Sequence, residues 1–130
     1  MKTKIRILKK LETNIKLFEN HDQKPAVFNY YCSNCNALNT VSIDFFQISI
    51  DTDELVKNQI LTEEEILNHK MLIKNSTGEL VVDRTLYSSR YITKECEFCS
   101  QKSLIIFGLG EHNPNRFVCK IAGVWSYEEK

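Results

Sequence analysis

Two Cys-x-x-Cys pairs are the residues of this chain whose type and spacing could do chemistry, namely Cys32 with Cys35 and Cys96 with Cys99. Two intervening residues let a tight turn, or knuckle, aim both sulfurs at one metal ion, about 2.3 Å away. Two such knuckles supply the four thiolates of a tetrahedral site. We therefore predict a zinc ion with a structural role, because four protein ligands leave no open position for a reacting water.

The gap between the two pairs is unusually long. It covers residues 36–95, whereas short-gap zinc sites separate their pairs by roughly 15 to 20 residues. Both pairs follow strand-like segments and lie among polar, turn-forming residues. We therefore interpret residues 40–93 as an insertion between two half-sites.

Residues 30–39 and 94–101 resemble the zinc-ribbon group, whose members hold a four-cysteine zinc between two knuckles, each at the tip of a β-hairpin. The resemblance implies that the four knuckle cysteines are the metal ligands. The chain departs from the group after each knuckle, where a glycine is common and where it has Asn36-Ala37 and Ser100-Gln101.

Other states of the knuckle cysteines stay open, namely thiols or disulfides without a metal, and a metal other than zinc. A redox-active pair would need a cysteine at a helix N-terminus, and neither pair opens a convincing helical pattern. The fifth cysteine, Cys119, alternates with Phe117 and Ile121. We expect it to face a core as a small apolar residue.

No enzyme constellation accompanies the cysteines. His21, His69 and His112 fall in three unrelated segments, and the chain has no HExxH pattern, phosphate-binding glycine loop or nucleophile elbow. Asp51 and Asp53 could bind magnesium, but neighbouring acids in a polar loop are more often solvated. We therefore expect a protein that is not an enzyme.

Composition indicates one domain. The chain has 130 residues, 42% of them hydrophobic, which suits a single core, and we take residues 1–130 as one domain. Its start lacks the apolar run of a secretory signal, and no stretch reaches the about 18 apolar residues of a membrane span. Metal-binding thiols also require reducing conditions. We expect a cytoplasmic protein.

Two helices are predicted around the knuckles. Apolar residues near the N-terminus recur at steps of three and four: Leu8, Leu11, Ile15 and Phe18. This spacing predicts an amphipathic helix over residues 4–19, within an N-terminal segment 1–22. Residues 62–65, Thr-Glu-Glu-Glu, have the form of a capping box and predict a second helix that continues to residue 73.

Strands are expected to carry both knuckles. We place them at residues 26–31, 41–50 with a bulge near 45–46, 80–86, 87–93, 103–109 and, after a turn at 110–115, 116–125. The sequence therefore predicts an α+β domain in which zinc pins an antiparallel sheet and both helices pack on that sheet.

The charges cancel overall, with 17 basic and 17 acidic residues, but they are unevenly spread. Residues 44–65 are strongly acidic, and Lys57 is their only basic residue. The simplest interpretation is a solvated face. The functional one is a set of carboxylates that contacts a basic partner: Asp51, Asp53, Glu54, Glu63 and Glu64. It favours a protein-binding module, such as a small inhibitor, adaptor or immunity-type protein that blocks a basic cleft.

Nucleic-acid binding is the alternative that the zinc-ribbon resemblance implies. Basic residues gather near the N-terminus: Lys2, Lys4, Arg6, Lys9 and Lys10. In this alternative they bind the phosphates of DNA or RNA. Because a dedicated nucleic-acid domain is usually basic overall, a protein partner is our first expectation.

Overall fold

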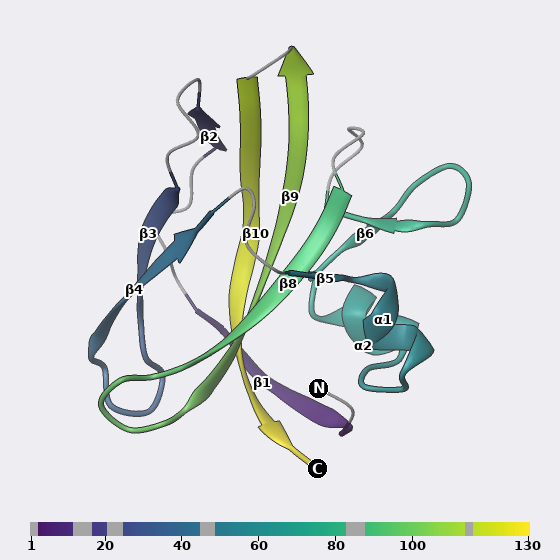
Figure 1. Cartoon of the computed structure of the whole chain (residues 1–130). Coiled ribbons are helices and arrows are strands. Elements are labelled where there is room, and N and C mark those ends of the chain that lie inside the picture. The colour runs from purple at the N-terminus through teal and green to yellow at the C-terminus, as the bar shows by residue number, and fades with distance from the viewer. Residues whose placement is uncertain (1–2, 12–16, 21–24, 45–48, 83–87, 114–115) are drawn as a thin grey trace.

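A twisted antiparallel sheet forms the centre of the computed structural model, which describes residues 3–11, 17–20, 25–44, 49–82, 88–113 and 116–130. In order across the sheet, its strands are β1 (Ile5–Leu11), β10 (Arg116–Glu129), β9 (Lys102–Asn113), β8 (Ser88–Glu95) and β5 (Ile50–Asp51). A further strand, β2 (Leu17–Asn20), also pairs with β10 (Figure 1). The two longest strands, β9 and β10, therefore lie at the centre of the sheet and pair with most of the others.

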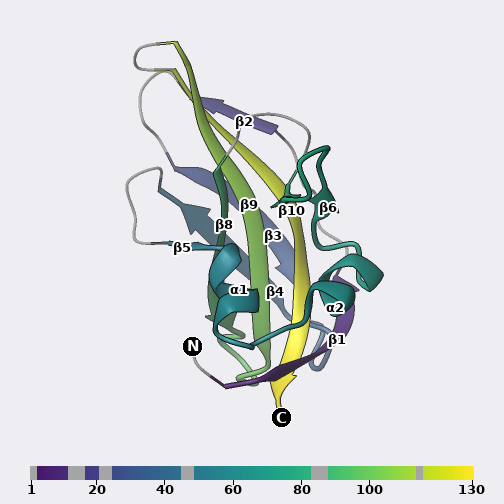
Figure 2. The ribbon, with the colours of Figure 1, turned by 90° about the vertical axis from the view of Figure 1, so that its right-hand side faces the viewer.

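A separate two-stranded hairpin, β3 (Ala26–Tyr31) and β4 (Leu38–Ile43), covers one face of this sheet. Its residues alternate strictly between buried and exposed, as expected for strands with one solvated face. Phe28 and Val41 point inward and pack with Phe107 and Ile121 of the main sheet. The hairpin makes up an outer layer of its own (Figure 2).

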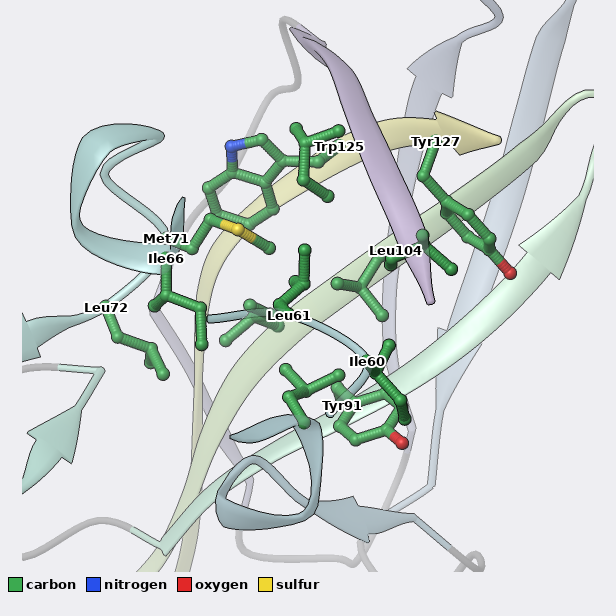
Figure 3. Close-up of a cluster of buried hydrophobic side chains, with 13 residues drawn as sticks. Ile60, Leu61, Ile66, Met71, Leu72, Tyr91, Leu104, Trp125 and Tyr127 are labelled. Atoms are coloured by element: carbon green, nitrogen blue, oxygen red, sulfur yellow. The ribbon is translucent and has the colours of Figure 1, made fainter. Parts of the chain in front are cut away.

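Two short helices, α1 (Asp53–Lys57) and α2 (Glu63–Asn68), cover the opposite face (Figure 2). They are followed by a small hairpin of β6 (Ile73–Lys74) and β7 (Leu80–Val81). Ile66, Met71 and Leu72 pack against Trp125 and Leu104 of the sheet (Figure 3). The indole Nε1 of Trp125 also donates to the carbonyl of His69, 3.2 Å away, which satisfies the polar end of a buried aromatic ring.

The apolar run at the centre of β9 serves both cores. Leu104 and Ile106 belong to the helical side, whereas Ile105 and Phe107 belong to the hairpin side. All four are fully buried. A strand covered on both faces needs such an uninterrupted hydrophobic run. This segment therefore allows three layers, with the main sheet between the β3–β4 hairpin and the two helices.

The predicted N-terminal helix is wrong, because residues 5–11 form the edge strand β1. Ile5 and Ile7 are buried on the helical side, and Leu11 is buried on the hairpin side. The register of β1 against β10 shifts between Ile7 and Lys9. This β-bulge moves the buried position to the other face. Leu8, which the predicted helical stripe contained, is 45% exposed. Ile15, in the same predicted stripe, lies outside the described residues.

The predicted fold class is therefore wrong as well: the chain is a mostly-β fold with two short helices. The capping box at Thr62 is confirmed, since its hydroxyl and the Glu65 side chain each bond the other's backbone amide. However, α2 ends at Asn68, and the chain then continues into β6 instead of the helix to residue 73. Among the described residues, no helix is long and apolar enough to cross a membrane.

The other predicted strands are partly confirmed. β3 has the predicted bounds, and β10 extends beyond residue 125 to Glu129. The turn predicted at residues 110–115 is wrong in its first part, because β9 continues to Asn113; residues 114–115 lie outside the described residues. The bulge predicted near residues 45–46 lies outside the described residues, as do most of 80–86.

Candidate metal centre

The two knuckles are built alike. Residues 32–37 join β3 to β4, and residues 96–101 join β8 to β9. In the first, Asn36 donates to the Cys32 carbonyl over 2.9 Å; in the second, Ser100 donates to the Cys96 carbonyl over 3.1 Å. The backbone amide of Cys32 also donates to the Ala37 carbonyl, and that of Cys96 donates to the Gln101 carbonyl. Each cysteine pair is thus held in the same closed backbone loop.

Both loops close through a left-handed residue. Asn36 has φ 60° and Ser100 has φ 66°, values that glycine adopts most readily. These are positions at which the sequence lacks the glycine common in zinc ribbons. Asparagine tolerates this conformation better than most residues, so Ser100 carries the larger backbone strain.

The loops bring the four knuckle cysteines together at the ends of the two hairpins. All four Sγ atoms lie within 4.8 Å of one another. Cys32 Sγ is 3.5 Å from Cys99 Sγ, and Cys35 Sγ is 3.6 Å from Cys96 Sγ. A tetrahedron with metal–sulfur bonds of 2.3 Å has edges of about 3.8 Å. The cluster therefore has the size and donor set of a four-thiolate zinc site.

Asn39 connects the two halves of the centre. It is buried at the start of β4, and its amide Nδ2 donates to Cys96 Sγ over 3.3 Å. Its Oδ1 accepts from the backbone amide of Glu97 over 3.2 Å. One side chain of the first hairpin thus fixes the second knuckle, in the way that outer hydrogen bonds orient metal ligands.

The thiols of the cluster differ in acidity. Burial raises the pKa of Cys96, but hydrogen bonds from Asn39 and from the amides of Phe98 and Cys99 outweigh it and lower the pKa to about 6. The Asn34 side chain and the Gln101 amide lower the pKa of Cys99. The Ala37 amide lowers the pKa of Cys35, yet partial desolvation and the other three thiols raise it to about 12. Crowded thiolates repel one another, so a dication would release the remaining protons.

Cys119 lies apart from this cluster. It is fully buried in the hairpin-side core, and burial raises its pKa to about 12. Its predicted role as a small apolar core residue is confirmed. A thiol with so high a pKa in apolar surroundings is unreactive.

The predicted acidic contact residues lie on the helical side. Asp51 is in β5, and its Oδ1 accepts the amide of Asp53 over 2.9 Å. Glu54 accepts from Asn58, and Glu63 forms an ion pair with Lys74. The carboxylates of Asp53 and Glu64 are exposed in the first turns of α1 and α2, where acids favour the helix dipole. Most of these acids therefore have a local structural role, in a turn, a helix or an ion pair.

The histidines belong to different parts of the chain. His69 is the C-cap residue of α2, and His112 belongs to β9, whereas His21 lies outside the described residues. In the described part of the chain, the knuckle cysteines are the one group of three or more potential ligands that could hold a metal ion.

Sequence reasoning missed Asn39, which bonds the second knuckle, and its buried cross-strand neighbour Tyr30. Both are buried at 1% exposure and face each other across the hairpin. Asn39 points to the same side of β4 as the buried Val41 and Ile43. A polar residue at such an inward-facing position was the sequence signal that could have identified it.

The fold and the centre together define a mostly-β chain with a four-cysteine cluster that is consistent with zinc binding. Comparison of the chain with protein-family models, with curated proteins and with solved structures finds no match in any of the three. Its function must therefore be argued from its own residues.

Proposed function

We propose that this protein is a non-enzymatic binding module, held together by one structural zinc ion, whose partner is another protein. The cluster of four cysteine sulfurs carries the zinc part of the proposal. Four thiolates fill a tetrahedral site, which suits a structural zinc and leaves no position for a reacting water.

Apolar side chains around the zinc centre support a protein partner. Tyr31, Leu38 and Phe98 are 57%, 48% and 68% exposed. Tyr31 and Leu38 are direct cross-strand neighbours beside the first knuckle, and Phe98 lies within the second. We call these three residues the zinc-end apolar set. Exposed aromatic residues on a rigid support are typical centres of protein interfaces.

The test is a capture experiment with matched variants. One variant carries Tyr31→Thr, Leu38→Thr and Phe98→Ser. The control carries Val56→Ser and Ile73→Thr, which change exposed apolar residues on the helical side. We expect wild type and control to retain one stoichiometric protein after nuclease treatment, and the first variant to lose it at an unchanged melting temperature. Retention by both variants would contradict the zinc-end interface.

The acidic residues of the insertion favour a basic surface on the partner. Asp53 and Glu64 have exposed carboxylates, and such charges act chiefly on the rate of association. Once the partner is in hand, Asp53→Asn with Glu64→Gln is expected to slow association and reduce its salt dependence. An unchanged association rate would remove these acids from the interface.

One observation favours nucleic acid as a second candidate. Lys9, Lys10, Tyr31 and Asn34 are among the residues that line a hollow of about 470 Å³ beside the first knuckle, and none of the described residues that line it carries a carboxylate. Lysines beside an exposed aromatic ring suit a single strand. In contrast, Arg6 on the same strand is paired with Glu128 at 3.0 Å. Nuclease-sensitive capture, lost in Lys9→Gln with Lys10→Gln, would favour this candidate over the protein partner.

A further inference from the structure

Tyr30 occupies the last inward-facing position of β3, next to the centre. Its side chain is 1% exposed. It lies directly opposite Asn39 in the hairpin register, and directly opposite residues share one face of a sheet. Since Asn39 bonds Cys96 Sγ, Tyr30 lies one cross-strand step from a residue that contacts the centre.

The Tyr30 hydroxyl forms no hydrogen bond of ordinary geometry in the structure. Of the buried side-chain nitrogen and oxygen atoms in the described residues, it is the one that lacks a hydrogen-bond partner. An unsatisfied buried polar atom costs about 1 to 3 kcal/mol, and native proteins rarely leave one without a reason. Burial raises the pKa of Tyr30, a hydrogen-bonding contact with the Ser103 side chain lowers it, and the charges of Cys96, Cys32 and Glu97 raise it. The Ser103 hydroxyl is therefore the competing partner for Tyr30, at a geometry poorer than an ordinary hydrogen bond.

We propose that the Tyr30 hydroxyl donates a hydrogen bond to one of the two buried thiolates of the zinc centre, Cys32 or Cys96, and so helps to hold the metal. The inference rests on the proposed structural zinc. It makes Tyr30 a positioning residue, which acts on the metal through its ligand.

The charge of the centre explains why such a donor is needed. Zinc with four thiolates has a net charge of −2, and that charge must be stabilised by hydrogen bonds where water is excluded. Cys32 and Cys96 are each 4% exposed, whereas Cys35 is exposed and Cys99 is half-buried. The Asn34 amide reaches Cys32 Sγ at 3.4 Å, and Asn39 reaches Cys96. A tyrosine hydroxyl one cross-strand step from Asn39 adds a third donor.

The Tyr30→Phe substitution tests the proposal because it removes the hydroxyl alone. Zinc affinity is measured by competition with a chromogenic chelator, and the thiolates are probed by the sulfur-to-metal charge-transfer band of the cobalt-substituted protein. We expect the zinc dissociation constant to rise by on the order of tenfold and the cobalt band to move to lower energy. An unchanged dissociation constant with a raised melting temperature would overturn the proposal. Removal of a buried hydroxyl that has no partner raises the melting temperature but leaves zinc affinity unchanged.

Two matched variants exclude a packing effect. Tyr91→Phe alters a buried tyrosine of the helical-side core, and Ser103→Ala removes the neighbouring hydroxyl; both are expected to leave zinc affinity unchanged. A loss in either variant as large as that in Tyr30→Phe would also overturn the proposal. If wild type itself binds no zinc, the proposed function fails. If wild type binds zinc and Tyr30→Phe binds it equally well, the inference about Tyr30 alone fails.

Discussion

At the scale of single residues, the centre depends on two left-handed positions that close the knuckles. Asn36 and Ser100 occupy equivalent places in the two loops, at φ 60° and 66°. Serine has no feature that compensates for this backbone conformation, whereas asparagine adopts it more readily. The two knuckles therefore share a geometry but differ in local strain.

Replacing Ser100 by glycine is expected to stabilise the zinc-loaded protein by about 1 kcal/mol, because the left-handed conformation costs glycine nothing. Asn36→Gly should give a smaller gain. Denaturant unfolding of the zinc-loaded protein measures both. As a control, Ser42→Gly at an exposed position of β4 should destabilise, since glycine weakens a strand. A loss of stability in Ser100→Gly would refute the strain argument.

The four cysteines of the cluster could be predicted from the sequence, but the residues that support them could not. Two cysteine pairs, each with two-residue spacing, are a local pattern that indicates a four-thiolate site, so Cys32 and Cys96 were identifiable directly. Asn39 acts through the register of β3 against β4 and through contact with a knuckle far along the chain. No local pattern contains that information.

At the scale of elements, the N-terminal strand shows where sequence periodicity misleads. A helix would bury Leu8, whereas β1 buries Ile5 and Ile7 and leaves Leu8 45% exposed. The bulge in β1 broke the alternation that identifies a strand. Elements without such an irregularity, such as β3 with its strict alternation and α2 with its capping box, could be predicted because their patterns are local.

Alanine substitutions distinguish the strand from the helix. Ile7→Ala should lower the free energy of unfolding by about 2 to 4 kcal/mol, because it empties a core position, whereas Leu8→Ala should change it by less than about 0.5 kcal/mol. Chemical denaturation of the two variants beside wild type provides the comparison. A larger loss for Leu8→Ala than for Ile7→Ala would instead support a helix.

At the scale of the whole molecule, the centre lies between two layers that share no backbone ladder within the described residues. The β3–β4 hairpin forms its own sheet and contacts the main sheet through side chains. The first knuckle is the loop that joins β3 to β4, and the second is the loop that joins β8 to β9 (Figure 1). A metal ion at this point would join the hairpin layer to the rest of the fold.

Zinc affinity is expected to fall as the pH is lowered from about 8 to about 5.5, because all four ligands must be deprotonated. The pKa of Cys96, about 6, leaves it ionised at neutral pH, whereas that of Cys35, about 12, keeps its proton until the metal displaces it. Below pH 6 a proton on Cys96 competes as well, so the loss should steepen there. Chelator competition at several pH values tests this, and a pH-independent affinity would contradict it.

The most direct test of the central claim is X-ray absorption at the zinc edge of the purified protein. The account predicts one zinc ion per chain, with a shell of four sulfur atoms at about 2.3 Å. A shell that contains nitrogen or oxygen would contradict the assignment of the four knuckle cysteines, and a protein purified without any metal would contradict the structural role of zinc.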